Sequence, residues 1–141
     1  MDGELTRSEF LAHGGKVCLT LATGGFLVMG CARIKSVDVD QARPAEAPPS
    51  FIVRESEVNP AYYFQKGGLR GVLVRTQDGI KGYRNVCTHL GGPTLFEEGA
   101  LHCQWHGSRY SPETGAVING PARKPLPALK LELKDGMVLL A

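Results

Sequence analysis

Two short segments of this sequence hold most of its metal-binding side chains. Cys87 and His89 form a Cys-x-His pair, and Cys103 and His106 form a Cys-x-x-His pair that begins after a gap of 13 residues. The whole chain has only four cysteines and four histidines. Because thiolate and imidazole groups bind the same metals, this clustering indicates a metal centre shared between the two segments.

Three interpretations of these four side chains are open. They could be ordinary buried residues, or they could hold one structural zinc ion, which accepts two sulfurs and two nitrogens. However, the order Cys-His-Cys-His and the tight Cys-x-His spacing are unusual for zinc. A cluster of two irons and two sulfides, with both cysteines on one iron and both histidines on the other, takes one ligand of each kind from each segment. Both segments continue in glycine, at Gly91 and Gly107, where backbone N–H groups can come close to cluster sulfides, so the residues favour the cluster.

The segments CTHLGG and CQWHGS, followed by Thr114-Gly115 and Gly120–Ala122, resemble the motifs of the Rieske [2Fe-2S] family. The resemblance extends over Phe51–Ala141, about two-thirds of the chain. It implies an all-β fold, a small antiparallel sandwich or barrel with two cluster-binding loops.

The resemblance also implies that Cys87 and Cys103 bind a buried iron, while His89 and His106 bind an outer iron and expose their far ring nitrogens. With two ferric ions, two sulfides and two thiolates the oxidised cluster is neutral, whereas four thiolates would leave it with two negative charges. Adding an electron to a neutral site is easier, so we expect a potential on the order of hundreds of millivolts above that of a four-cysteine cluster. Ferric iron also acidifies the far imidazole N–H groups, so a proton can follow the electron, which suits hydroquinone chemistry.

Further residues of the two segments point to different branches of the family. Rieske subunits of quinol-oxidising cytochrome bc complexes usually join the two loops by a disulfide, and its two positions are Gly92 and Trp105 here. In that respect the chain resembles a Rieske-type ferredoxin, and we expect Trp105 to cover the cluster instead. Ser108 and Tyr110 stand where the quinol-oxidising branch places hydroxyl groups on a bridging sulfide and on a cysteine sulfur, which would raise the potential. His102 matches no ligand position.

An uncharged apolar segment, Val17–Cys31, lies near the N-terminus. It is shorter than the about 20 residues of a membrane-spanning helix, and it fits the apolar part of an export signal. LVMGC, which ends at Cys31, resembles a lipobox, and TRSEFL resembles a twin-arginine signal with Ser8 in place of the second arginine. We expect residues 1–31 to be an export signal that leaves a lipid on Cys31, or a retained membrane anchor; a short buried helix is the remaining alternative. Either main interpretation places the domain outside the cytoplasm on a membrane.

Residues 32–50 are rich in alanine, proline and charge, and they predict a flexible linker. From residue 51 to residue 141 the pattern is that of some nine short strands, with hairpins indicated at Asp78-Gly79 and Asp135-Gly136. Three leucines alternate with charged residues in the last hairpin and are expected on its buried face: Leu129, Leu131 and Leu133.

The sequence predicts an electron-transfer protein without a catalytic site of its own. It has no room for the second iron domain of a Rieske oxygenase, and a net charge of +2 without a basic run argues against nucleic acid. The main hypothesis is the iron–sulfur subunit of a membrane quinol-oxidising cytochrome bc-type complex, with cytochrome b-type and cytochrome c-like partners. The alternative is a small subunit or ferredoxin-like carrier that serves another extracytoplasmic oxidoreductase, such as an arsenite oxidase-like enzyme.

Overall fold

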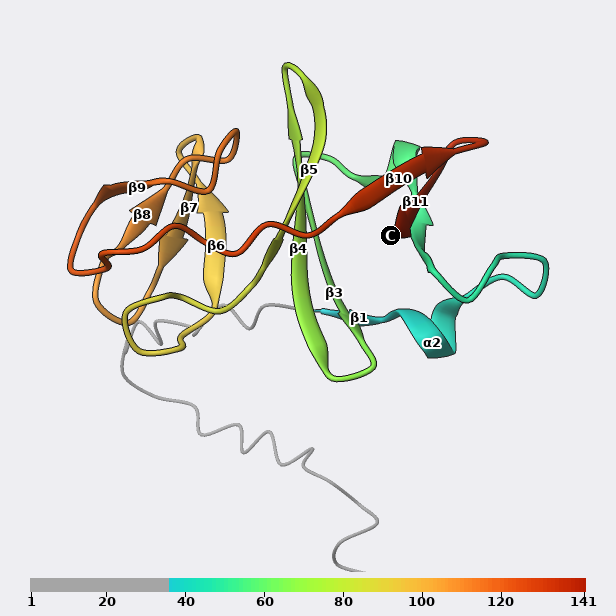
Figure 1. The fold of residues 1–141 in the computed structure, drawn as a ribbon, viewed down its shortest axis with the longest axis horizontal. Coiled ribbons are helices and arrows are strands. Elements are labelled where there is room, and N and C mark those ends of the chain that lie inside the picture. The colour runs from blue at the N-terminus through green and yellow to red at the C-terminus, as the bar shows by residue number, and fades with distance from the viewer. Residues whose placement is uncertain (1–35) are drawn as a thin grey trace, which may run out of the picture. The chain divides into compact units, whose positions relative to one another are not determined.

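Short strands are the main regular elements in the part of the chain that the computed structural model describes, residues 36–141 (Figure 1). In chain order the elements are β1 (Val37–Asp38), α2 (Val39–Ala42), β2 (Phe51–Arg54), the 3₁₀ turn η1 (Glu55–Glu57), β3 (Ala61–Lys66), β4 (Leu69–Thr76), β5 (Gly79–Arg84), β6 (Thr94–Glu97), β7 (Ala100–Cys103), β8 (Arg109–Tyr110), β9 (Val117–Asn119), β10 (Leu131–Lys134) and β11 (Met137–Leu140). They form three sheets with the strand orders β1-β3-β4-β5, β10-β11-β2 and β6-β7-β8-β9. Within these sheets only β1 and β3 run parallel, so the expected antiparallel all-β fold is confirmed.

Both hairpins that the Asp-Gly pairs predicted are present. In the first, Thr76 of β4 pairs with Gly79 of β5, so the turn itself is Gln77-Asp78, and Gly79 opens β5 with a φ of +109°. In the second, β10 and β11 are joined by Asp135-Gly136, whose φ angles of +52° and +71° suit a tight two-residue turn. The Asp-Gly signal therefore located each hairpin, and it missed the exact turn by one residue in the first.

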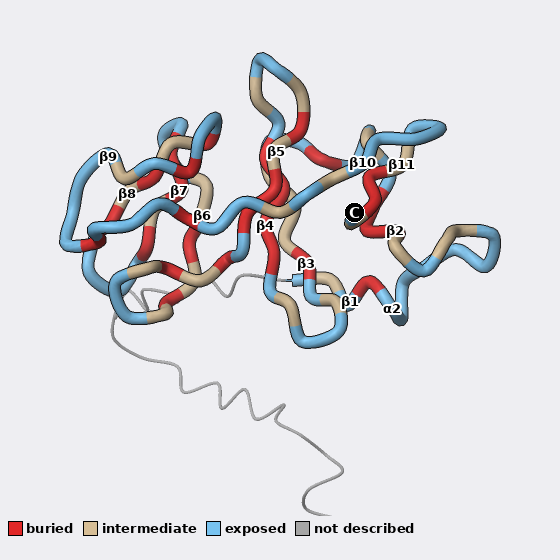
Figure 2. Tube along the Cα trace, in the orientation of Figure 1, coloured by how far each residue is buried: buried red, intermediate tan, exposed pale blue. Residues whose placement is uncertain are grey.

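Strand β4 separates two hydrophobic cores, because Leu73 faces one of them while its neighbours Val72 and Val74 face the other. The scaffold core consists of Val39, Phe51, Ile52, Val53, Val58, Phe64, Leu73, Ile80, Val138 and Leu139. The cluster-side core consists of Val72, Val74, Tyr83, Cys87, Leu101, Cys103, Tyr110, Ala122 and Leu126. Figure 1 shows the β6–β9 sheet and the β10-β11-β2 sheet on opposite sides of the central sheet, and Figure 2 shows the buried run along β4 between them.

One expectation for the last hairpin is wrong, because Leu133 is 47% exposed. Leu129 and Leu131 are partly buried against the scaffold core, as their alternation predicted. Leu133 continues the same face, but it lies at the end of an edge strand, next to the exposed turn at Asp135. The alternation of a strand predicts which side chains share a face, and it does not say how far the core extends beneath that face.

The flexible linker predicted for residues 32–50 is also wrong in part, because β1 and α2 pack onto the domain. Val37 and Asp38 pair with β3, and the Val39 side chain is buried in the scaffold core with 1% exposure. The Asp40 carboxylate pairs with the Lys66 ammonium at 2.6 Å. A single buried valine and a two-residue strand are too short a pattern to distinguish from a linker in the sequence.

Candidate metal centre

The two segments with Cys and His pairs form loops with the same backbone hydrogen bonds. In loop 1, Cys87–Gly92, the N–H of Gly91 donates to the carbonyl of Cys87 at 2.8 Å, and the N–H of Cys87 donates to the carbonyl of Gly92 at 2.7 Å. In loop 2, Cys103–Ser108, the corresponding bonds join Gly107 to Cys103 at 3.0 Å and Cys103 to Ser108 at 2.8 Å.

A glycine with positive φ makes this shared geometry possible in each loop. Gly91 has a φ of +80° and Gly107 a φ of +76°, a region in which residues with a Cβ are strained. Each of these glycines stands four residues after its cysteine. The two loops thus present a cysteine at the same place, and they differ in whether the histidine follows two or three residues later.

Loop 1 is held beside loop 2 by a buried asparagine that the sequence analysis did not single out. The Asn85 side-chain oxygen accepts hydrogen bonds from the N–H and the hydroxyl of Thr94, at 2.7 and 2.8 Å. Asn85 stands just before loop 1, and Thr94 begins β6, where it pairs directly with Cys103. An uncharged polar residue two positions before the Cys-x-His pair was the available signal.

The two cysteine side chains lie together in the cluster-side core, with 3% exposure for Cys87 and 1% for Cys103. Burial favours the neutral thiol of Cys87, but hydrogen bonds from the Tyr110 hydroxyl and from the backbone N–H groups of His89 and Leu90 outweigh it and lower its pKa. Burial raises the pKa of Cys103, although backbone N–H groups of its own loop also point at its sulfur. Both sulfurs therefore sit where a coordinated iron, which deprotonates thiols outright, finds donors already aimed at the thiolate.

The two histidine side chains lie on the solvent side of the loops. His89 and His106 are both exposed, and their ring centroids are 5.0 Å apart with the ring planes at 85°. The structure therefore brings together the four side chains that the sequence singled out, as a buried sulfur pair and an exposed nitrogen pair. No three Cys, His, Asp or Glu side chains gather around one point within residues 36–141.

The Tyr110 hydroxyl lies 3.1 Å from the sulfur of Cys87, the kind of atom that the resemblance assigns to it. It accepts a hydrogen bond from the N–H of Thr88 at 3.1 Å, and the Thr88 hydroxyl lies at the same distance. Since the Thr88 hydroxyl donates its own proton to the carbonyl of Lys124 at 2.6 Å, it competes with the Cys87 sulfur as an acceptor for the single proton of Tyr110. The N–H of Thr88, a residue that the sequence analysis did not single out, thus holds the Tyr110 oxygen in place beside the sulfur.

Ser108 is fully buried, and its hydroxyl oxygen accepts a hydrogen bond from the N–H of Ala122 at 3.1 Å. A hydroxyl that accepts still has its own proton to donate, so Ser108 keeps a donor beside loop 2. Ala122 belongs to a third loop, residues 120–125, whose first residue is Gly120 with a φ of +96°. A Cβ at Gly120 would lie 2.5 Å from the Cα of Ser108, so only glycine allows the third loop to approach this closely.

Trp105 packs across the two loops. A Cβ built on Gly92 would lie 2.7 Å from an indole carbon of Trp105, so the ring of loop 2 covers the bare backbone of loop 1. These are the two positions that the resemblance links to a disulfide in other branches. His102 lies in β7, outside the two pairs, and contacts the Glu97 carboxylate at 3.1 Å.

The donor set fits a two-iron cluster. Two buried thiols and two exposed imidazoles stand in separate pairs, and backbone N–H groups point at the sulfurs. Such a centre at the tip of a small antiparallel β-domain defines a class of iron–sulfur electron-transfer proteins. The family model for the Rieske [2Fe-2S] domain matches residues 49–130, more than half of the chain, and the chain belongs to this family. It carries a Rieske-type [2Fe-2S] cluster and transfers electrons through it.

Curated relatives are named as subunits of cytochrome complexes. The chain is 35% identical over 82 residues to a cytochrome b6-f complex iron-sulfur subunit of Prochlorococcus marinus, which covers 52% of this chain and 46% of the relative. It is 39% identical over 64 residues to a cytochrome bc1 complex Rieske iron-sulfur subunit of Streptomyces lividans, covering 43% of this chain and 38% of the relative. The chain thus spans less than half the length of these two relatives.

Solved structures share the fold. A cyanobacterial plasma membrane Rieske protein from Synechocystis PCC 6803 superimposes with a TM-score of 0.56 at 19% identity, over 65% of this chain and 96% of that one. The ferredoxin of carbazole 1,9a-dioxygenase from Nocardioides aromaticivorans superimposes with a TM-score of 0.54 at 22% identity, over 64% and 94% of the two chains. The same domain is therefore found both in a membrane-associated protein and in a ferredoxin.

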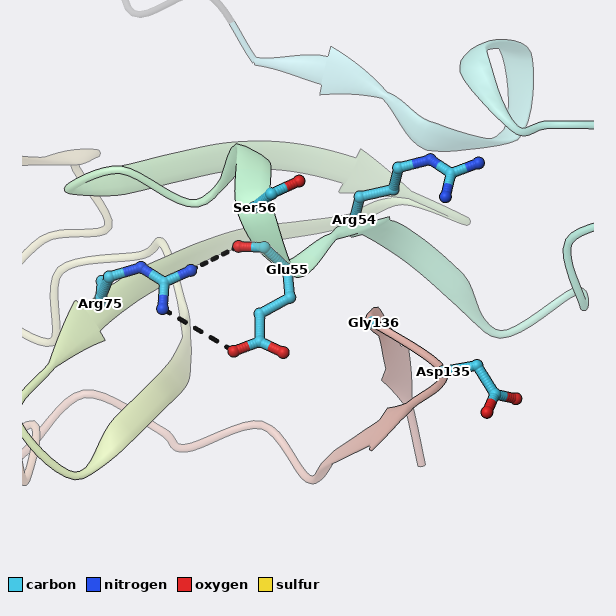
Figure 3. Close-up of a pocket in the computed structure, with 6 residues that line it drawn as sticks. All are labelled: Arg54, Glu55, Ser56, Arg75, Asp135 and Gly136. Carbon is cyan, nitrogen blue, oxygen red and sulfur yellow. Dashed lines mark hydrogen bonds and ion pairs between the residues drawn. The ribbon is translucent and has the colours of Figure 1, made fainter.

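A pocket of about 480 Å³ lies away from the cysteines, between β2, η1, β4 and the β10–β11 turn (Figure 3). Its Arg75 pairs with the Glu55 carboxylate at 3.8 Å and donates to the backbone oxygens of Glu55 and Val58, so it holds η1 in place.

Within residues 36–141, no helix has the length and apolar character needed to cross a membrane. The proposed lipid site Cys31 and the rest of residues 1–35 lie outside the described part of the chain.

Proposed function

We propose that Cys87 and Cys103 bind the inner iron of the cluster and that His89 and His106 bind the outer iron. The support is the pairing of these side chains, with both sulfurs buried and both imidazole rings exposed 5.0 Å apart. The bound cluster accepts and returns one electron. The two histidines, whose ring nitrogens away from the iron face solvent, take up and release the proton that accompanies it.

We propose further that the chain is the iron–sulfur subunit of a quinol-oxidising complex of the cytochrome bc kind. The observation that carries this proposal is the Tyr110 hydroxyl, 3.1 Å from the sulfur of Cys87. A hydrogen bond to a ligand sulfur stabilises the reduced cluster, which carries one more negative charge, and so raises the potential. A high potential is what allows the cluster to withdraw an electron from a quinol. The names of the cytochrome b6-f and bc1 relatives also support this proposal.

In this proposal the partners are a cytochrome b-type subunit, a quinol and a cytochrome c-like acceptor, and the domain lies outside the cytoplasm. Residues 1–31 attach it to the membrane, either as a retained helix or through a lipid on Cys31. Two or three acyl chains are sufficient for stable attachment, whereas one alone is marginal. Mass spectrometry of the mature N-terminus distinguishes these forms. A lipid mass on Cys31 supports the lipoprotein, and an unmodified chain that starts at Met1 contradicts it.

The second candidate is a ferredoxin-like carrier or a small subunit of another extracytoplasmic oxidoreductase, such as an arsenite oxidase-like enzyme. The observation in its favour is the contact between Trp105 and Gly92, at the two positions where quinol-oxidising subunits usually carry a disulfide. The fold shared with a dioxygenase ferredoxin agrees with this candidate as well.

A redox titration of the purified full-length protein, followed by electron paramagnetic resonance at several pH values, separates the two candidates. Quinol oxidation predicts a potential near the top of the range of roughly −150 to +300 mV that Rieske centres cover, and one that falls as pH rises because a proton accompanies the electron. A potential near the bottom of that range supports the carrier instead. Protein that holds zinc and no acid-labile sulfide would contradict the ligand assignment itself.

A further inference from the structure

The cluster-binding tip has an unusual distribution of charge. Residues 86–96 and 103–108, which contain loops 1 and 2, include no lysine, arginine, aspartate or glutamate. The only formally charged side chains of the third loop are Arg123 and Lys124, and both are exposed. Neither takes part in an ion pair within the described residues. Apart from the cluster and its ligands, the three loops therefore present two positive side-chain charges and no negative one.

Two hydrogen bonds hold the backbone of the third loop against loops 1 and 2. The N–H of Ala122 donates to the Ser108 hydroxyl at 3.1 Å, and the carbonyl of Lys124 accepts from the Thr88 hydroxyl at 2.6 Å. Thr88 directly precedes His89. Arg123 thus stands between two points of attachment, one to loop 2 and one to loop 1, so the position of its backbone is set by the fold.

The acidic side chains of the same sheet stand at its other end. Thr94 and Cys103 pair at the cluster end of the β6–β7 hairpin, and Glu97 pairs with Ala100 three residues further along. Three residues of a strand span about 10 Å. The Glu97 carboxylate forms a hydrogen bond with the His102 ring, and the carboxylate of Glu98, the next residue in the turn, pairs with Arg109.

The tip also exposes two large apolar side chains, Leu90 at 61% and Trp105 at 58%. A surface that combines exposed apolar side chains with charges of one sign is suited to docking a protein of opposite charge.

We propose that this tip docks an acidic redox protein, with Arg123 and Lys124 facing carboxylates on the partner and with Leu90 and Trp105 against an apolar patch. One electron leaves the reduced cluster and reduces the partner's centre. The inference rests on the proposed ligand set and on electron transfer through the cluster, and it does not require that quinol be the electron donor. It adds the chemistry of the acceptor, whose acidic surface the tip attracts and orients.

The test compares the reduced full-length protein with two charge-reversal variants in stopped-flow oxidation. Oxidised plastocyanin serves as the acidic acceptor and oxidised mitochondrial cytochrome c as the basic one. R123E/K124E reverses the charge of the tip. K130E/K134E makes the same change in net charge at exposed lysines on the opposite side of the domain. We expect R123E/K124E to slow the reaction with plastocyanin by on the order of tenfold or more at low ionic strength and to speed that with cytochrome c. K130E/K134E should change both rates much less.

Equal effects of the two double variants would show that net charge alone acts, and would overturn the proposal. A second result would also overturn it. The wild type would bind phosphatidylglycerol vesicles and not neutral ones, R123E/K124E would lose that binding, and the reaction of R123E/K124E with plastocyanin would be unchanged. The visible and paramagnetic spectra of each variant are recorded first. An intact cluster without charge dependence contradicts only this inference, whereas wild-type protein that holds no two-iron cluster contradicts the proposed ligands.

Discussion

The two cores of the domain are built from different kinds of buried side chain. The scaffold core, around Phe64, Leu73 and Val138, consists of aliphatic and phenyl groups that can only pack. The cluster-side core includes both cysteines and the hydroxyl-bearing Tyr83 and Tyr110. The first core is complete in the polypeptide alone, whereas the second contains sulfur atoms whose charged form needs iron beside it.

The two sides also differ in what holds their loops. On the scaffold side, tight two-residue turns, Gln77-Asp78 and Asp135-Gly136, close hairpins whose strands are paired along their length. On the cluster side, side chains hold the backbone at three points, through Asn85 to Thr94, Ser108 to Ala122 and Thr88 to Lys124. We infer that the scaffold provides most of the stability, while the cluster side is kept ordered by specific hydrogen bonds and by the cluster.

The largest effect should come from changing the outer ligand pair while leaving the scaffold alone. His89→Cys combined with His106→Cys adds two thiolate charges, so we expect the potential to fall by hundreds of millivolts, towards roughly −400 mV. A redox titration monitored by electron paramagnetic resonance measures this shift. His102→Gln, which changes a histidine next to Cys103, should leave the potential almost unchanged. A double variant with an intact cluster and an unaltered potential would refute the assignment of the histidines.

A matched pair of glycine substitutions compares the two sides directly. A Cβ at Gly71 would lie 2.2 Å from the ring of Phe64, which is 1% exposed and cannot move aside. A Cβ at Gly92 would lie 2.7 Å from the ring of Trp105, which is 58% exposed and can swing outwards.

We therefore expect Gly71→Ala to lower the free energy of unfolding by about 3 kcal/mol, the upper end for an overpacked core. Gly92→Ala should lower it by about 1 kcal/mol or less and should instead hasten loss of the cluster, because the cover between the loops is displaced. Thermal unfolding followed by circular dichroism reports the first effect, and bleaching of the visible absorbance reports the second. A larger loss of unfolding free energy in Gly92→Ala than in Gly71→Ala would contradict this division of roles between the two sides.

A smaller effect is expected from the hydroxyl groups beside the cluster. Tyr110→Phe and Ser108→Ala each remove a donor that stabilises the reduced state, so each should lower the potential by several tens of millivolts, where about 59 mV corresponds to a tenfold change in equilibrium. Tyr63→Phe is the matched control, since the Tyr63 hydroxyl accepts from the N–H of Phe96 on the same side of the domain, with no sulfur as its partner. If Tyr110→Phe moves the potential no more than Tyr63→Phe does, the hydroxyl does not act on the cluster.

The smallest effect concerns the scaffold side and pH. The hydrogen bond from Lys66 lowers the pKa of the Asp40 carboxyl, which holds α2 against β3. A carboxyl with a lowered pKa in the folded state binds fewer protons there than in the unfolded chain, so its stabilisation is present above about pH 4 and disappears as pH falls further. Asp40→Asn should therefore reduce the melting temperature slightly at pH 7 and not at pH 3. Asp78→Asn, in the exposed β4–β5 turn, should show no such difference.

The sequence by itself determined the features that depend on neighbours along the chain. The Asp-Gly pairs located two hairpins because a tight turn needs residues that tolerate positive φ. The Cys-x-His and Cys-x-x-His pairs, each with a glycine four residues after its cysteine, were sufficient to predict the two loops that the structure places side by side. The charge of the cluster followed from the number of thiolates alone.

Only the tertiary structure decided which distant residues meet. Tyr110 reaches Cys87 across 23 residues, and Thr88 reaches Lys124 across 36, through contacts that no local period encodes. The same holds for Trp105 over Gly92 and for the burial of Val39, which turned part of an expected linker into part of the core. Hydrophobic period and turn propensity act over a few residues, whereas these contacts form only when several sheets close on one another, and their geometry depends on the whole packed domain.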